Sequence, residues 1–504
     1  MKKKLIVSSL IWISAGSAFG STGGKQNIIF FLVDDMGWQD TSVPFWTDST
    51  KWNKLYNTPN MERLARMGVK ITHAYASPVS SPTRVSVMTG MNSAAHRVTN
   101  WTLERDKMVD RTSDVINMPR WNFNGLQPVD TIPNSVCATT LPQILQQNGY
   151  KTIMLGKAHF GATQTPGADP LNLGFDVNVG GHAGGGVRSY LGTENFGNNT
   201  ESLQAVPHLE KYHGKNVFLT EALTIEAIEQ LKIAQTEKKP FFLYMAHYAI
   251  HVPLDKDQRF YQKYIDQGVD DNTARYAALI EGTDKSLGDI LDYLKENDLT
   301  KNTTIVLMGD NGGLSAVRRS GQHHNYPLRS GKGSSYEGGI RVPMIAHIPG
   351  FTRGATTTKV VVEAPDIFPT VLHIAGVTKY KTIQKVTGRN VLTKLSDLSN
   401  WKQQRALIFH FPNKWDVDGD GVGTFSAIIK GDWKLIYHYD KKTTELYNIK
   451  EDIFEIINQA HNPSQQERRE SLAQELTRKL RIMKAQVPTL KNGKDCDYPN
   501  GKNY

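Results

Sequence analysis

Four short runs of apolar residues along the chain are each typical of a strand that is buried on both faces. They occupy residues 27–33, 241–245, 304–308 and 344–348. In residues 220–234 and 274–294 the apolar positions recur every three to four residues, which indicates amphipathic helices. Because parallel strands are joined by helices, this alternation predicts an α/β fold with a large, mostly parallel sheet flanked by helices.

The pattern changes after about residue 378, where the chain becomes polar and weakly periodic up to residue 405. Residues 427–430 and 433–438 then predict two strands of a smaller sheet, and residues 465–485 predict a helix. Three regions are therefore expected: a large domain over 21–378, an α+β subdomain with a small antiparallel sheet over 379–490, and a loose polar tail over 491–504.

Residues 1–20 have the order of a secretory signal peptide. Lys2, Lys3 and Lys4 are followed by an apolar stretch over 5–15 and by small residues before position 21. The apolar stretch is too short for a membrane anchor, and no later stretch is long enough to cross a bilayer. We expect an exported protein, in the periplasm, with no stable membrane insertion.

Composition excludes several classes of protein. Hydrophobic residues make up 39% of the chain and aromatic residues 9%, enough for a packed core and unlike a disordered or fibrous sequence. The formal charge is +10, or +7 without the three lysines of residues 1–20, but the basic residues are scattered, so no nucleic-acid partner is expected. Cys137 and Cys496 lie far apart and are expected to be unpaired thiols rather than a disulfide scaffold.

Polar side chains directly follow three of the predicted strands. They are Asp34 and Asp35, then His247 and His251, then Asp310 and Asn311. In open α/β sheets the functional crevice lies beyond the carboxyl ends of the strands, so these groups are expected to converge, with His247 as a support residue. Asp34, Asp35, Asp310 and Asn311 supply hard oxygen ligands only, which suits Ca²⁺ or Mg²⁺.

The segment Ser80-Ser81-Pro82-Thr83-Arg84, with Met88-Thr89-Gly90 beyond it, is the most specific motif. It resembles the signature of the type I formylglycine-dependent sulfatases of the alkaline phosphatase superfamily, in its serine form. In that family the first residue of the signature is oxidised to an aldehyde, formylglycine. Alone, so short a match is also compatible with a chance turn, since Ser-Pro pairs are common.

Further elements of the same family follow in the family's order and extend the resemblance from about residue 26 to residue 455. They are Val-Asp-Asp-Met-Gly at 33–37, Gly-Lys-Ala-His at 156–159, His-Val-Pro at 251–253, Gly-Asp-Asn-Gly-Gly at 309–313, Lys-Gly at 332–333, Glu-Gly-Gly-Ile-Arg-Val-Pro at 337–343, Gly-Asp-Trp-Lys-Leu at 431–435 and Glu-Leu-Tyr-Asn at 445–448.

The resemblance implies an active site that fits the chemistry of sulfate ester hydrolysis. A sulfate monoester is an anion that must expel an alkoxide, which needs neutralising charge, a strong nucleophile and an acid. The family's metal is usually calcium, with magnesium the second choice, and the implied ligands are Asp34, Asp35, Asp310, Asn311 and the oxygen of residue 80. Ser80 as an alcohol is a weak nucleophile, whereas formylglycine hydrates to a diol that attacks sulfur.

The resemblance also implies a role for each remaining polar residue of the motifs. Arg84 would hold the diol, and Lys157 would bind a sulfate oxygen. His251, with Lys332, would protonate the departing sugar oxygen. His159 would take a proton from the second hydroxyl, which releases sulfate and restores the aldehyde.

Two further segments are candidates for substrate contact. His182 lies in the glycine-rich loop 180–186, and Trp415 and Asp416 lie in a C-terminal loop that reaches the cleft in related sulfatases. Residues 416–421 (Asp-Val-Asp-Gly-Asp-Gly) also resemble the start of a calcium loop, but the closing Glu of an EF-hand is missing, so a second calcium stays open.

The family implies the partners and two competing functions. Exported sulfatases with a serine signature resemble the glycan sulfatases of gut Bacteroidetes, which implies a radical maturase that acts on Ser80. The expected substrate is a terminal sulfated sugar, with galactose or N-acetylgalactosamine sulfate first. One alternative is a phosphatase or phosphodiesterase with two metals, although Lys157 and Lys332 stand where the second metal would need ligands. The other is a non-catalytic glycan-binding protein.

Overall fold

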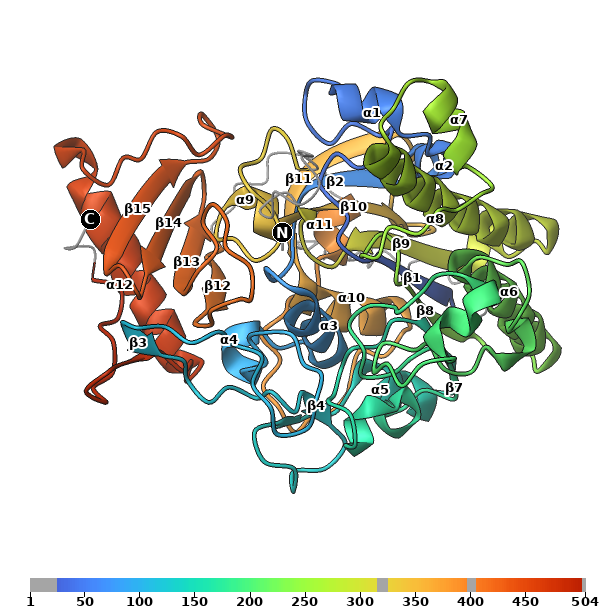
Figure 1. Ribbon diagram of the computed structural model, residues 1–504, viewed down its shortest axis with the longest axis horizontal. Coiled ribbons are helices and arrows are strands. Elements are labelled where there is room, and N and C mark those ends of the chain that lie inside the picture. Colours follow the sequence, from blue (N-terminus) through green and yellow to red (C-terminus); the bar gives the residue numbers. More distant parts are fainter. Residues whose placement is uncertain (1–24, 315–324, 397–404, 501–504) are drawn as a thin grey trace, which may run out of the picture.

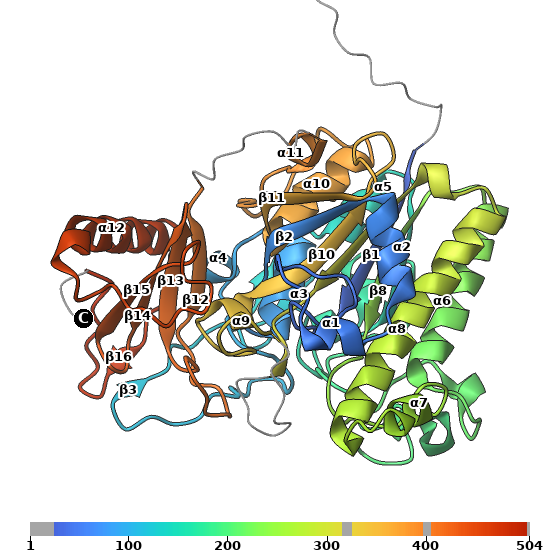
Figure 2. The same ribbon diagram turned by 90° about the horizontal axis from the view of Figure 1, so that it is seen from above.

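A computed structural model describes residues 25–314, 325–396 and 405–500, so the predicted signal peptide lies outside the described residues. In this part of the chain the main sheet has eight strands, which Figures 1 and 2 show at the centre of the larger lobe. In sheet order they are β11 (Thr356–Glu363), β2 (Val69–Tyr75), β10 (Arg341–His347), β9 (Thr303–Gly309), β1 (Asn27–Val33), β8 (Phe241–His247), β6 (Lys151–Gly156) and β7 (Val177–Val179). The predicted α/β class is confirmed.

The sheet is mixed because one of its strands runs against the others. β1 pairs in parallel with both β8 and β9, and β6 pairs in parallel with β7 and β8. β10 is antiparallel to both β9 and β2, so the parallel direction predicted for residues 344–348 is wrong. The chain leaves β9 at the edge where that strand ends and enters β10 from the same edge. An apolar run reports burial but not direction, so the sequence pattern could not reveal this return.

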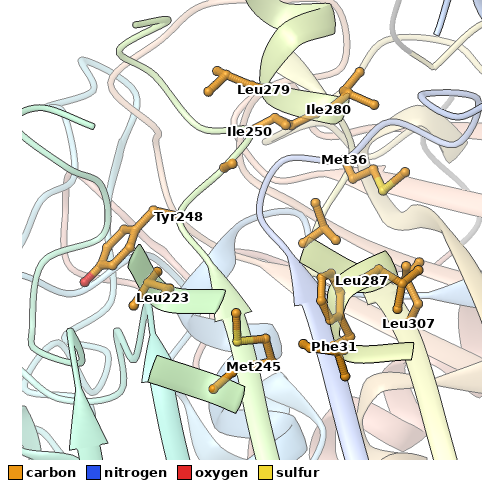
Figure 3. Packing of buried hydrophobic residues seen from close by; sticks show 14 of the residues in the cluster. Phe31, Met36, Leu223, Met245, Tyr248, Ile250, Leu279, Ile280, Leu287 and Leu307 are labelled. Atoms are coloured by element: carbon orange, nitrogen blue, oxygen red, sulfur yellow. The ribbon is translucent and has the colours of Figure 1, made fainter. Parts of the chain in front are cut away.

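Helices cover both faces of the sheet, and the residues of β1 alternate between them. Ile29, Phe31 and Val33 pack toward α2 (Pro59–Met67), α6 (Leu219–Thr236) and α8 (Asp271–Glu296), as Figure 3 shows for Phe31 beside Leu287. The residues between them pack toward α3 (Ser80–Thr89), α5 (Leu141–Gln147) and α10 (Ile367–Ile374). This double cover explains why the strands are apolar throughout.

The second lobe is a four-stranded antiparallel sheet with one long helix, on the left in Figure 1. Its elements are β12 (Leu407–Phe411), β13 (Phe425–Lys430), β14 (Trp433–His438), β15 (Thr443–Asn448) and α12 (Gln466–Ile482). The loop between β12 and β13 returns to the larger lobe, and α9 (Glu337–Ile340) lies between the two sheets in both views.

The remaining α-helices and strands of the described chain are short. They are α1 (Lys51–Leu55), α4 (Ser93–His96), α7 (Tyr261–Asp266), α11 (Leu392–Ser396), β3 (Ile116–Asn117), β4 (Leu126–Gln127), β5 (Val136–Cys137) and β16 (Thr489–Leu490). Cys137 and Cys496 are both free thiols, as predicted. Over the described residues, no helix is both long and apolar enough to span a bilayer.

Candidate active site

The carboxyl ends of β1 and β9 bring four oxygen-bearing side chains together. Carboxylate oxygens of Asp34, Asp35 and Asp310 lie within 4.8 Å of one another, and all three residues are buried. The Asn311 amide donates to Asp35 Oδ1 at 2.8 Å, and the Asp35 backbone N–H donates to Asp310 Oδ1 at 3.1 Å. The neighbouring strands β1 and β9 therefore hold these groups in fixed relative positions.

Ser80 begins α3 and points into the same cluster. Its Oγ lies 3.1 Å from Asp34 Oδ1 and 3.0 Å from Asn311 Oδ1, and Lys157 Nζ donates to it at 3.2 Å. Every residue of α3 is buried, and Ser80 itself is only 2% exposed. A helix of this kind has no solvated face, so it holds its first residue rigidly over the ends of the strands.

Three buried cations stand among the three carboxylates of this site. Arg84 donates through Nε and Nη2 to Asp310 Oδ2 at 3.0 and 2.8 Å. Lys157 Nζ lies 2.6 Å from Asp34 Oδ2, and Lys332 Nζ lies 2.6 Å from Asp35 Oδ1. The pairing explains how the site tolerates so many buried charges.

Burial and pairing act in opposite directions on the titration of these groups. Burial is the largest influence and raises the pKa of Asp34 and of Asp35, but the neighbouring cations together, with Lys157 first for Asp34 and Lys332 first for Asp35, bring both values below the usual range. Burial lowers the pKa of Lys157 to about 8, against the opposing effect of Asp34. The carboxylates are thus ionised at neutral pH and are ready to bind a cation.

The two histidines of the motifs differ in their hydrogen bonds. His159 Nε2 donates to the Thr102 carbonyl at 2.8 Å, so its Nδ1 carries the lone pair, and no group of the described chain bonds to that atom. Burial, with Lys157 nearby, keeps the His159 pKa well below its ordinary value, so the ring is neutral and able to accept a proton. His251 Nδ1 instead donates to the Val252 carbonyl at 2.8 Å, which leaves Nε2 for the site, 3.8 Å from Asp35 Oδ2.

A cavity of about 400 Å³ opens above these groups. Ser80, Lys157, His159, His251 and Lys332 all line it. Its volume is within the range of small-molecule sites.

The predicted substrate contacts divide into two kinds. Trp415 and Asp416 line the cavity, and they come from the loop between β12 and β13. His182 is not among the lining residues. Its Nδ1 accepts from the Gly184 backbone N–H at 3.1 Å, and its ring lies 6.1 Å from that of Tyr248, so it sits behind the loop wall that Gly185 and Gly186 form.

His247 does not reach the cavity either. It is fully buried as the last residue of β8, its Nε2 lies 2.9 Å from the Ser286 hydroxyl, and its ring packs against Phe31. This placement agrees with the supporting role expected for it.

Several cavity residues have no counterpart among the sequence predictions. Gln204 is the most informative, because its Oε1 accepts from the Gly186 backbone N–H at 2.9 Å. Since only an oxygen can accept from that donor, Nε2 is the other end of the Gln204 amide, and no hydrogen bond from it to another described residue is seen. Trp101 and Leu254 add apolar wall. All three lie outside regular helices and strands, where no periodic pattern marks a position.

The buried acidic cluster fits a calcium ion. Its donors are carboxylate and amide oxygens, and Asp35 Oδ2 is buried without a hydrogen-bond partner among the described residues. Oxygen-only ligand sets suit Ca²⁺ and Mg²⁺ rather than softer metals. Asp34, Asp35, Asp310 and Asn311 are the residues that would hold it.

A buried seryl group, cations and a hard-metal ligand set at the ends of parallel strands define an alkaline-phosphatase-like hydrolase of anionic esters. Sequence comparison then gives the family. The profile described as Sulfatase matches residues 26–377, and one described as N-sulphoglucosamine sulphohydrolase, C-terminal, matches residues 329–483. The chain belongs to the sulfatase family and is a sulfuric ester hydrolase, which confirms the resemblance drawn from its motifs.

Individual relatives agree with this assignment. A sulfatase of Formosa agariphila is 29% identical over 94% of this chain and 91% of its own length. Human N-acetylgalactosamine-6-sulfatase is 28% identical over 75% of this chain and 67% of its own. Ps i-CgsB, whose structure was solved in complex with k-i-k-neocarrahexaose, is 27% identical with a TM-score of 0.71, over 91% of this chain and 93% of its own.

Proposed function

We propose that the protein is an exo-acting carbohydrate sulfatase that hydrolyses a sulfate monoester on a terminal sugar of a glycan. The observation that carries this proposal is the position of Ser80 Oγ, which lies at the floor of the cavity within 3.2 Å of Asp34, Asn311 and Lys157. Galactose or N-acetylgalactosamine sulfate is the preferred class, supported by the similarity to N-acetylgalactosamine-6-sulfatase and to Ps i-CgsB, which was solved in complex with k-i-k-neocarrahexaose.

A screen against sulfated mono- and disaccharides that differ in ring and in sulfate position tests this function directly. We expect the protein, with Ser80 converted to formylglycine, to release sulfate from at least one sulfated galactose or N-acetylgalactosamine. If the converted protein releases sulfate from no sugar in the screen, the proposed function is wrong.

The nucleophile in this proposal is residue 80 after oxidation to formylglycine, which hydrates to a diol. Calcium, when bound, would supply positive charge that neutralises the sulfate and favours the ionised nucleophile. Arg84 is locked onto Asp310 and lies beside Asp34, so it holds the floor in place. Lys157 Nζ, beside Ser80 Oγ, is placed to bind a sulfate oxygen. His159, neutral with a free Nδ1, is placed to accept the proton whose loss restores the aldehyde.

His251 is the proposed acid for the leaving group, with Lys332 beside it. Both line the cavity, and both contact Asp35. Because Nδ1 of His251 donates to a backbone carbonyl, Nε2 has a proton to transfer only when the ring is the imidazolium ion, in which both nitrogens are protonated. Burial and Lys332 lower the pKa of His251, and Asp35 opposes them, so the carboxylate helps the ring to hold that proton.

Replacement of His251 by alanine is expected to separate substrates by their leaving groups. A sugar alkoxide needs protonation as it departs, so kcat on a sugar sulfate should fall by roughly 10² to 10⁴, the usual contribution of an acid. Nitrophenolate leaves without a proton, so hydrolysis of nitrophenyl sulfate should fall by less than about tenfold. Steady-state kinetics on both substrates measures the difference, and equal losses on the two would exclude His251 as the acid.

Gln204 is expected to contribute to sugar binding more than His182 does. Gln204 lines the cavity with a free amide donor, whereas His182 lies behind the wall. One hydrogen bond to a bound hydroxyl contributes about 0.5–1.5 kcal/mol, so Gln204→Leu should lower kcat/KM on the best sugar sulfate by roughly two- to tenfold. His182→Ala is the matched comparison. A larger loss in His182→Ala than in Gln204→Leu would restore His182 as the specificity residue.

The phosphatase alternative requires a second metal site. In the described part of the chain, Asp34, Asp35 and Asp310 form the only acidic cluster of this kind, and Lys157 and Lys332 stand directly beside it. This arrangement supports one metal and a sulfate ester. Two zinc ions per chain in a metal titration would favour the phosphatase, and a glycan that binds without turnover would favour the non-catalytic alternative.

The proposal includes the protein's location and its partner in maturation. Residues 1–20 support export, and we place the mature chain in the periplasm, where a sulfated glycan would reach it. A serine at position 80 supports oxidation by a radical maturase rather than by an oxygen-dependent enzyme.

A further inference from the structure

Residues 416–421, whose sequence resembles the start of a calcium loop, have other partners in the fold. Asp418 pairs with Arg111 at 3.0 Å, and Asp420 pairs with Arg329 through two bonds of 2.7 and 2.9 Å. Asp416 lines the cavity instead. The carboxylates of this segment therefore diverge to separate partners, whereas a calcium loop turns its carboxylates inward toward one point.

The partner of Asp420 belongs to the segment that carries Lys332. Arg329 stands three residues before Lys332, and Ser330 Oγ also donates to the Asp420 carbonyl at 2.6 Å. On the far side of Lys332, the Ser335 N–H donates to the Gly421 carbonyl at 3.0 Å. The loop of residues 415–421 thus makes hydrogen bonds to this segment on both sides of Lys332.

The same loop also packs closely against Gly333, the residue that follows Lys332. The Trp415 ring covers Gly333 so closely that a β-carbon there would lie 2.2 Å from Trp415 Cε3. Gly333 also has a φ of +81°, a conformation that other residues rarely adopt. The backbone N–H groups of Lys332 and Gly333 donate to Gly313 and Pro78 in the larger lobe. The segment is therefore held between the two lobes.

We propose that residues 415–421 act as a clamp that positions Lys332, and that they do not bind a second calcium ion. Asp420 is a positioning residue in this proposal: it acts through Arg329 and touches no substrate. The role of the positioned lysine, assistance to His251 at the leaving group, rests on the proposed function. The clamp itself rests only on the contacts of the segment.

Asp418 and Asp420 offer a matched pair of substitutions in one loop. Both side chains are more than half exposed, so neither Asp418→Ala nor Asp420→Ala is expected to unfold the protein. Asp420→Ala should lower kcat on a sugar sulfate about tenfold with little change in KM, because small displacements of a catalytic group are costly. The loss on nitrophenyl sulfate should be smaller, since that leaving group needs no proton. Asp418→Ala should stay within about twofold of the parent on both substrates.

Amide hydrogen exchange tests the clamp without reference to activity. Exchange at Lys332, Gly333 and Ser335 should be faster in Asp420→Ala than in the parent protein and unchanged in Asp418→Ala. Unchanged exchange in Asp420→Ala would overturn the clamp. Faster exchange in a protein that hydrolyses no sulfate ester would keep the clamp and reject only the proposed function.

Calcium titration of the full chain separates the clamp from a metal loop. One Ca²⁺ per chain is expected in the parent protein and in both variants. A second Ca²⁺ that is lost in both Asp418→Ala and Asp420→Ala would overturn the proposal. If the melting temperature of Asp420→Ala is far below that of Asp418→Ala, the variant Arg329→Lys is used in place of Asp420→Ala. Lysine keeps the positive charge but cannot make the two hydrogen bonds that Arg329 makes to Asp420, so the same faster amide exchange is expected.

Discussion

The protein with Ser80 replaced by alanine is expected to be folded and inactive toward every sulfate ester. Ser80 makes its hydrogen bonds only within the floor of the site, and removal of one hydroxyl leaves the ion pairs of Arg84 and Lys157 in place. Loss of a covalent nucleophile costs a hydrolase on the order of 10⁶ in kcat. Steady-state assays on nitrophenyl sulfate and on a sugar sulfate measure this loss.

A matched control lies on the same helix. Ser86 is also buried, but its hydroxyl contacts His96 Nε2 at 3.0 Å, away from the cluster, so Ser86→Ala should retain activity. Intact peptide mass completes the test: active protein should carry residue 80 lighter by two hydrogens than serine. Full activity in protein whose Ser80 is entirely unmodified would refute the formylglycine mechanism.

Removal of calcium is expected to stop turnover without unfolding the protein. Neutralising charge from a metal contributes several kcal/mol to such reactions, so chelation should lower the rate roughly a thousandfold, and added Ca²⁺ should restore it. The fold should survive because Arg84, Lys157 and Lys332 still pair with Asp310, Asp34 and Asp35 when the metal is gone. Activity assays and circular dichroism of the chelated protein check both parts.

Two substitutions of buried aspartates sharpen this prediction. Asp35→Asn should weaken calcium binding and activity together, because Asp35 Oδ2 is a buried oxygen of the cluster to which no described residue donates a hydrogen bond. Asp40→Asn is the control: Asp40 accepts from Gly37 and Tyr276 outside the cluster, so its neutralisation should leave calcium affinity unchanged. A calcium excess of 100 Kd stabilises a fold by about 2.7 kcal/mol, so thermal melting with and without Ca²⁺ measures binding independently of activity. Equal calcium affinity in the two variants would exclude Asp35 as a ligand.

The elements that sequence reasoning found are those whose pattern has one physical meaning. Some apolar runs are followed directly by acidic residues. These runs predicted the strands, and they also predicted the edge of the sheet where Asp34 and Asp310 meet, because parallel strands end at a common edge. The direction of β10 was missed, since burial on both faces looks the same whichever way a strand runs. Family resemblance, and not periodicity, pointed to Trp415.

Residues that act through one isolated contact left no signal in the sequence. Gln204 is oriented by a single backbone N–H that lies eighteen residues away, and nothing in its neighbourhood differs from an ordinary polar loop. His182 shows a different limit: a histidine among glycines suggests an exposed, adaptable loop, whereas its ring is half-buried and lies beside Tyr248, and its predicted contact with substrate stays a prediction. The three aspartates of residues 416–421 suggested a metal site. The sequence does not tell whether such carboxylates will point toward one another or toward different arginines.

The pairing of β1 has a consequence for the time at which residue 80 can be modified. Both neighbours of β1 lie more than two hundred residues further along the chain, so the central strand has no partner until residue 247 has been synthesised, and only one partner until residue 309. During that delay α3 has no sheet to cover, and Ser80 is reachable on an extended chain. Once β8 and β9 dock, every residue of α3 is buried and that access closes. An enzyme that oxidises Ser80 would have to act before β8 and β9 dock. A chain that folds before this oxidation would retain an unmodified serine at position 80.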